Sequence, residues 1–147
     1  MYNVLILWAP DSSETRKVVE SMRAAFNEGR FKTTAKKAAE SSIVDIAAAD
    51  LVIFGSQKSG ASEVPPEYSD LMRIFKGVTL AGRAAGVFSV GTEKASAKIR
   101  KSLKDTEVAL FDEDPLFDNE AQGSASDVGK WASKLAGFFQ EVRRTRE

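Results

Sequence analysis

The sequence predicts an α/β fold in which a five-stranded parallel sheet lies between two helical layers, a three-layer doubly wound arrangement with strand order 2-1-3-4-5. Short apolar runs alternate with stretches of helical periodicity along the 147 residues, which is typical of parallel strands joined by helices. The apolar runs are continuous, as expected for strands covered on both faces. No internal repeat or linker divides the chain, so we expect one domain over residues 1–147.

The first apolar run, residues 4–8, predicts a buried strand, and a helix follows it. Asp11 with Glu14 three residues later resembles a capping box, in which side chains bind the free N–H groups of the first turn. Helical periodicity then continues until Gly29, a typical helix stop. The apolar positions of this predicted helix are Val18, Val19, Met22, Ala25 and Phe26.

A weaker strand over residues 31–35 is followed by two lysines, which is typical of a sheet edge. A short helix capped by Ser41 or Ser42 leads to the third strand, residues 51–54. The remaining predicted elements are a helix with Tyr68, Leu71, Met72 and Phe75 on one face, a strand over 84–90, a basic helix opening at 91–93, a strand over 108–111, an acidic loop over 112–126 and a final helix from 128.

The composition excludes several classes of function. The chain has no Cys and no His, so disulfides, thiol catalysis, thiolate metal sites and a Ser-His-Asp triad are all excluded. The usual general base near neutral pH is missing as well. We therefore predict no catalytic residues and no metal site, and we do not expect a stand-alone enzyme.

Charge and hydropathy bear on partners and location. Lys plus Arg, at 21, balance Asp plus Glu, also 21, so no net charge favours nucleic acid or an anionic membrane. No apolar run is long enough to span a bilayer, and the N-terminus lacks the features of a signal peptide. We expect a cytoplasmic protein, and the sequence is compatible with a monomer or a homodimer.

The order and spacing of elements resemble the flavodoxin family over nearly the whole chain. Residues 49–56 are similar to its third strand and the start of its first flavin loop. Residues 80–91 are similar to its fourth strand and the turn toward its second flavin loop, and residues 15–19 to the start of its first helix. The resemblance implies FMN binding at the carboxyl ends of strands one, three and four, and electron transfer with a redox partner protein.

The resemblance also implies which residues would bind the cofactor. The hydroxyl residues near the start of the first helix would meet the phosphate, and residues of the two flavin loops would line the ring through backbone groups. These residues are Ser12, Ser13 and Thr15 for the phosphate, and Ser56, Gln57, Gly91 and Thr92 for the ring.

The chain departs from the family pattern in its phosphate loop, residues 10–15. The pattern of hydroxyl residues around one Gly keeps its hydroxyls at Ser12 and Thr15, but Pro10 replaces a hydroxyl residue and Ser13 replaces the Gly. Pro offers no N–H, and Gly would let N–H groups approach a phosphate closely.

Two carboxylates, Asp11 and Glu14, stand where a phosphate would bind and would repel a dianion. The loops over residues 55–62 and 91–96 hold no aromatic side chain to stack on a flavin ring. Two hypotheses follow: an FMN-binding protein of the flavodoxin type, or a flavin-free binding or scaffold module on the same fold.

Two clusters of charged residues lie in the second half of the chain. Acidic residues follow the last predicted strand, and we interpret them as a solvated loop rather than a Mg²⁺ site. Basic residues crowd the fourth predicted helix, and we interpret them as a solvated helix face. The acidic residues are Asp112, Glu113, Asp114 and Asp118, and the basic ones are Lys94, Lys98, Arg100, Lys101 and Lys104.

Overall fold

The computed structural model describes residues 1–26, 30–58, 64–91, 93–117 and 121–146, apart from the side chains of residues 121–125 and 146. A parallel sheet runs through its middle in the order β2-β1-β3-β4-β5, which confirms the predicted strand order, and a further short strand, β6, also pairs with β4. The strands are β1 (Tyr2–Ala9), β2 (Phe31–Lys37), β3 (Leu51–Gln57), β4 (Ala84–Val90), β5 (Ala109–Leu110) and β6 (Leu116–Phe117).

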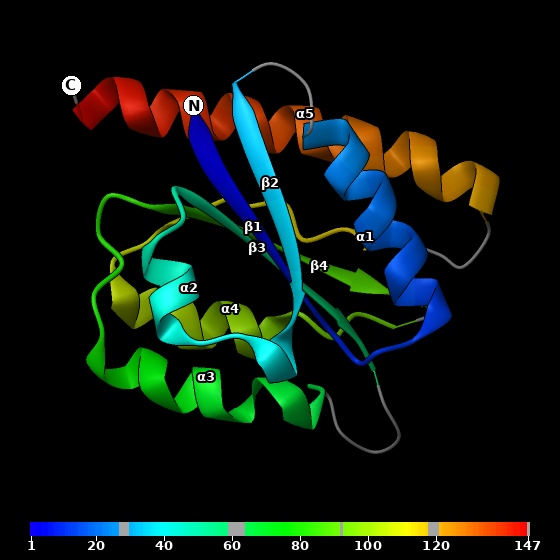
Figure 1. Ribbon diagram of the computed structural model, residues 1–147, viewed down its shortest axis with the longest axis horizontal. Helices are drawn as coiled ribbons and strands as arrows, with labels where there is room; N and C mark the ends of the chain where they lie inside the picture. Colours follow the sequence, from blue (N-terminus) through cyan, green and yellow to red (C-terminus); the bar gives the residue numbers. More distant parts are fainter. Residues whose placement is uncertain (27–29, 59–63, 92, 118–120, 147) are drawn as a thin grey trace.

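Helices cover both faces of the sheet, as predicted (Figure 1). One face carries α1 (Ser13–Phe26) and α5 (Ala121–Arg146), and the other carries α2 (Ile43–Ala47), α3 (Ser69–Ile74) and α4 (Ala97–Leu103). Short 3₁₀ turns join several of these elements at η1 (Ala38–Glu40), η2 (Pro66–Tyr68), η3 (Phe75–Gly77) and η4 (Lys104–Thr106). None of the described helices combines the length and apolar character that a membrane span needs.

Two hydrophobic cores explain why the strands read as continuous apolar runs. Successive side chains of a strand point to opposite faces. In β1, Val4 and Ile6 pack in the core under α1 and α5, whereas Leu5 and Leu7 pack in the core under α2, α3 and α4. Both faces exclude water, so both sets of side chains are apolar.

The edge of the sheet lies where the lysines predict it. Among the described strands, β2 pairs with β1 alone, and it runs on through Lys36 and Lys37 rather than ending before them. Lysines on an edge strand hinder pairing with another chain. Of the two serines predicted to cap this helix, Ser42 is the N-cap of α2, and it forms a capping box with Asp45.

The prediction of one strand over residues 108–111 is wrong in its extent. Only residues 109–110 pair with β4, and a second pairing forms further along at Leu116 and Phe117. Arg100 binds the segment between them, since its guanidinium contacts the Phe111 carbonyl and bonds Asp114 at 2.6 and 2.7 Å. The predicted acidic loop over 112–126 therefore contains β6 and the first turn of α5.

One predicted helix limit also changes, and another is not tested. Helix α4 begins at Ala97 rather than at residues 91–93. Gly91 has a φ of 106°, which ends the strand in a left-handed turn, and the Ser89 hydroxyl accepts the Ala95 N–H at 2.8 Å. These contacts keep the backbone before Ala97 out of the helix. Helix α1 ends at Phe26, and the predicted stop at Gly29 lies outside the described residues.

Candidate ligand crevice at the carboxyl ends of β1, β3 and β4

The strand order reverses beside β1, and ligands of open α/β sheets bind in the crevice at such a point. The chain leaves β1 for β2 on one side and reaches β3 and β4 on the other. Register pairs Ala9 with Ser56 and Ser56 with Ser89, so the three strands end side by side. The described residues at and after these ends, 10–15, 57–58, 91 and 93, are the ones that the topology brings to the crevice.

Ser12 caps helix α1. Its hydroxyl accepts the Thr15 N–H at 3.1 Å, and its carbonyl accepts the Arg16 N–H at 3.0 Å. The prediction that Asp11 caps this helix with Glu14 is therefore wrong. A hydroxyl at the N-cap satisfies one of the first-turn N–H groups, which have no acceptor inside the helix.

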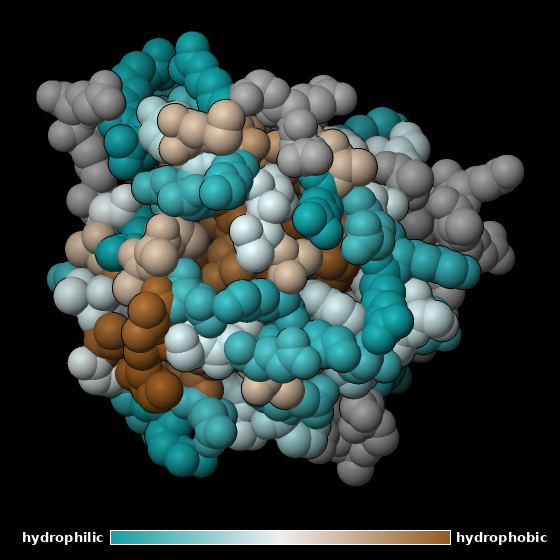
Figure 2. Space-filling view, viewed as in Figure 1, coloured by the Kyte–Doolittle hydropathy of each residue, from teal (hydrophilic) through white to brown (hydrophobic). Residues whose placement is uncertain are grey.

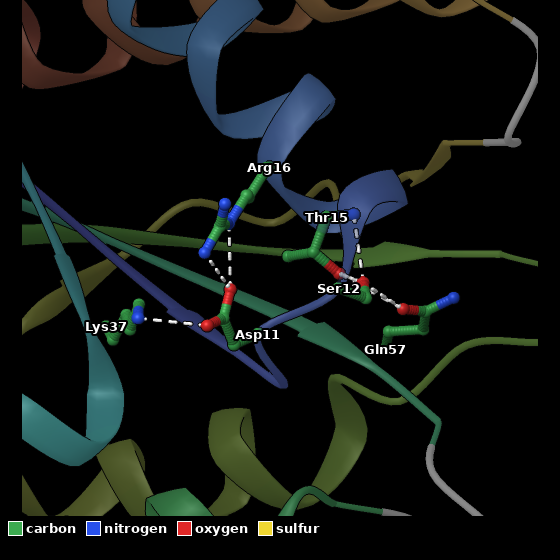
Figure 3. A network of polar contacts seen from close by, with 6 residues as sticks. All are labelled: Asp11, Ser12, Thr15, Arg16, Lys37 and Gln57. Carbon is green, nitrogen blue, oxygen red and sulfur yellow. Dashed lines mark hydrogen bonds and ion pairs between the residues drawn. The ribbon is translucent and has the colours of Figure 1, made fainter.

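Asp11 instead holds two cations (Figure 3). Its carboxylate lies 2.8 Å from the Arg16 guanidinium and 2.9 Å from Lys37 Nζ at the end of β2. The hydrogen bond from Lys37, and then that from Arg16, hold the pKa of Asp11 below its usual value of 3.8. Arg16 also lies over the Trp8 ring, 5.8 Å from its centroid. Both cations beside the phosphate loop thus already have a carboxylate partner.

Gln57 reaches from the end of β3 to the start of α1 (Figure 3). Its Oε1 lies 2.6 Å from the Ser12 hydroxyl and 3.1 Å from that of Thr15, and the two hydroxyls are 2.8 Å apart. Its Nε2 donates to the Glu14 carboxylate at 2.9 Å. An amide oxygen has two lone pairs and can accept from both hydroxyls, so this one side chain satisfies the polar groups that the phosphate would bind.

The other two strand ends are also connected to this group. A Cβ added at Gly91 would lie 3.5 Å from Gln57 Nε2, so the carboxamide packs against the end of β4. Lys58, after β3, forms an ion pair with Glu93, after β4. Side chains therefore link all three strand ends across the crevice.

The structure brings together only part of the predicted set. Ser12, Thr15 and Gln57 meet, and Gly91 lies beside them. Ser13 is exposed in the first turn of α1. Ser56 is fully buried, and its hydroxyl has no hydrogen-bond partner among the described residues. Thr92 lies outside the described residues.

Sequence reasoning did not find the bond from Gln57 to Glu14 or the pair of Lys58 with Glu93. One signal could have revealed Gln57 as a bridge. It is a polar residue at the end of a buried strand, opposite a helix start that holds two hydroxyls. The pair of Lys58 with Glu93 joins positions 35 residues apart, and no local pattern indicates it.

The residues around the start of α1 do not fit a phosphate dianion. The Ser12 and Thr15 hydroxyls bind Gln57, and Pro10 offers no N–H. Glu14, in the first turn of α1, adds a carboxylate that would repel a dianion, whereas the Asp11 carboxylate is already paired with Arg16 and Lys37.

The ring position lacks the usual stacking partner as well. Residues 55–58, 91 and 93–96, the described parts of the two loops, include no aromatic side chain. Tyr68 is fully buried and donates its hydroxyl to the Gly55 carbonyl at 2.7 Å. Trp8 is buried in the core under α1 and α5. Neither ring is available to stack on a ligand in the crevice.

No protein-family model and no curated protein sequence matches this chain. Solved structures match it by fold. Flavodoxin 1 of Bacillus cereus superposes with a TM-score of 0.82 at 15% identity, over 92% of this chain and 97% of that one. Flavodoxin 2 of the same organism gives 0.81 at 19% identity, over 92% and 98%. The Fusobacterium nucleatum flavodoxin bound to flavin mononucleotide gives 0.75 at 14% identity, over 95% and 99%. The chain therefore has the flavodoxin fold.

Proposed function

We propose that this chain is a binding module with the flavodoxin fold that works without FMN, because its own side chains close the cofactor crevice. The single observation that carries the proposal is the Gln57 carboxamide, which binds Ser12, Thr15 and Glu14 at the start of α1. A phosphate would have to displace Gln57 and then approach the Glu14 carboxylate, to which Gln57 now donates a hydrogen bond.

Burial makes this arrangement hard to exchange. Thr15 is fully buried and Ser12 partly so. A buried polar group that loses its partner costs about 1–3 kcal/mol, so the displaced carboxamide would have to find new partners. The closed state thus gives the Ser12 and Thr15 hydroxyls and the Gln57 carboxamide partners without a ligand.

A second candidate, an FMN-binding protein with a role in electron transfer, is favoured by one observation. The hydroxyls of Ser12 and Thr15 converge at the start of α1, where the N–H groups of Ser13 and Glu14 have no acceptor inside the helix. In this case those groups would hold the phosphate, and the flavin would supply the redox chemistry. The named flavin complex among the structural matches supports the same candidate.

Absorbance and calorimetry separate the two candidates. We expect purified protein to be colourless and to give no binding heat with FMN. A yellow protein that carries flavin in a fixed ratio, or a saturable FMN titration, would replace the first candidate with the second.

A gain-of-function variant tests the physical reason. We combine Asp11→Thr, Ser13→Gly and Gln57→Ala, which remove one carboxylate, restore the Gly and free both hydroxyls. We expect this triple variant to bind FMN more tightly than the wild type does. Riboflavin, which lacks the phosphate, is the control ligand and should show no such gain. An unchanged FMN affinity would contradict the role given to Gln57.

A further inference from the structure

Helices α3 and α4 lie on the face of the sheet opposite α1 and α5 (Figure 1). A groove with a basic rim lies between them. Its volume is about 400 Å³. Partly buried Val64 and Met72 supply its apolar surface, and exposed Arg73 and Lys76 stand at its edge. Figure 2 shows a separate group of hydrophobic side chains near the left, C-terminal end of α3, the helix that ends at exposed Ile74.

Basic residues concentrate beside this groove although the chain has no net charge. Residues 94–104 hold four lysines and one arginine and no acidic residue. Helix α4 buries Ile99 and Leu103, so Lys101 lies on its outward face, next to Ser102 at the groove. Lys76 and Lys101 are both exposed.

Arg100 binds Asp114 and turns toward β5 and β6, whereas Lys76 and Lys101 form no ion pair with the described residues. Arg73 pairs with Asp70 at 3.5 Å, but both side chains are more than 70% exposed, at 74% and 86%. Such a pair contributes little and is screened by salt, so Arg73 can take another carboxylate partner at small cost.

We propose that the groove between α3 and α4 docks an acidic segment of a protein partner. One large aliphatic side chain of that segment would fill the apolar surface at Val64 and Met72. Its flanking carboxylates would bind Arg73, Lys76 and Lys101. Charge complementarity and the size of the groove carry this assignment. The inference goes beyond the proposed function and holds whether or not the crevice binds FMN.

A nucleic acid fits the same surface less well. The aromatic residues of the region, Tyr68 and Phe75, are fully buried and offer no platform for stacking bases. Asp70 stands exposed beside Arg73 and would repel a continuous phosphate backbone. A short peptide can place its carboxylates on the cations and avoid Asp70.

The test uses a fluorescein-labelled Glu-rich peptide with one central Leu, and it follows anisotropy. We expect saturable binding that weakens as salt rises. The double variant K76E/K101E should weaken binding by about tenfold. The matched control K17E/K130E makes the same change of charge with exposed lysines on α1 and α5, and it should stay within about twofold of the wild type. Circular dichroism checks that both variants fold.

A second arm tests the apolar surface. Met72→Ala should weaken the Leu peptide several-fold and leave a peptide with Gly in place of Leu unchanged. The proposal is overturned if the peptide does not bind, or if both double variants lose the same amount of peptide affinity. It is also overturned if duplex DNA, or vesicles of phosphatidylserine and phosphatidylcholine, bind more tightly than the peptide. An FMN titration of K76E/K101E should match that of the wild type, which keeps this test separate from the crevice.

Discussion

Ser12 connects the start of a helix with the end of a distant strand. Its hydroxyl accepts the Thr15 N–H and also meets Gln57 Oε1 at 2.6 Å. A residue with both contacts stabilises the helix and holds the crevice closed at once. Its neighbour Ser13 has the same side chain but lies exposed in the first turn. A comparison of the two serines therefore separates the effect of position in the chain from the effect of the hydroxyl group.

Ser12→Ala is expected to lower the free energy of unfolding by about 1 kcal/mol or more, because the cap is lost. Ser13→Ala is the matched control and should stay within about 0.5 kcal/mol of the wild type, as exposed substitutions usually do. Urea denaturation followed by circular dichroism measures both. Equal losses in the two variants would contradict the capping role.

Asp11 predicts a dependence of stability on pH. Lys37 first, and then Arg16, lower its pKa in the folded state below the usual value of 3.8. A lowered folded-state pKa stabilises the fold above the unfolded-state pKa, and this contribution disappears as pH falls through the folded-state value. Asp11→Asn should therefore melt below the wild type near neutral pH.

The same comparison at a pH well below 3.8 provides the check, since the contribution of Asp11 disappears as the carboxylate of the folded protein takes up its proton. The difference in melting temperature should shrink there. It should also shrink in high salt, because these exposed ion pairs are screened. A difference that is the same at both pH values would show that the charge of Asp11 does not stabilise the fold.

At the scale of elements, a cross-strand pair of residues determines how the ends of β3 and β4 pack against each other. Gly55 lies directly opposite Phe88 in the register, and a Cβ at Gly55 would come within 2.3 Å of the Phe88 ring. The missing side chain thus leaves room for the ring, which packs against Trp131 of α5. Tyr68 holds the other side of this strand end through the Gly55 carbonyl.

Gly55→Ala is expected to destabilise the protein by about 1–3 kcal/mol, since the added methyl group overpacks the core. Gly77→Ala is the control, because a Cβ there meets nothing within 4 Å. Thermal and urea unfolding compare the two. If Gly55→Ala were as stable as Gly77→Ala, the strands could shift apart more easily than this packing implies.

At the scale of the whole molecule, Trp131 joins α5 to the edge of the sheet at β4, β5 and β6. Its ring lies about 6 Å from those of Phe88 in β4, Phe111 after β5 and Phe117 in β6. Its Nε1 donates to the Glu113 carbonyl at 3.0 Å, inside the segment that separates β5 from β6. One buried side chain thus holds the interrupted edge of the sheet against the longest helix.

Trp131→Ala is expected to lower the free energy of unfolding by about 3–5 kcal/mol, because it removes a large buried side chain and leaves a cavity. Leu116→Ala, in the same region but 37% exposed, should cost less. Urea denaturation ranks the two variants. The reverse order would show that β6, rather than Trp131, holds this edge.

The site was less predictable than the fold, and particular residues show why. The periodicity of the strands and helices follows from local sequence, so the layer order and the edge at Lys36 and Lys37 could be predicted. The closure by Gln57 depends on a contact across 45 residues, from Ser12 to Gln57. Asp11 offers several plausible partners in sequence, and only the position of Lys37 on the neighbouring strand selects among them.

The sequence by itself determined the α/β class, the strand order and the absence of His and Cys chemistry, because these depend on local periodicity and composition. The tertiary structure alone decided the interrupted last strand and the bridging role of Gln57. Both depend on which polar groups meet once distant segments pack, whereas the Ser12 cap joins residues only three apart. A buried polar group must find a partner, and the fold determines which partner lies within reach.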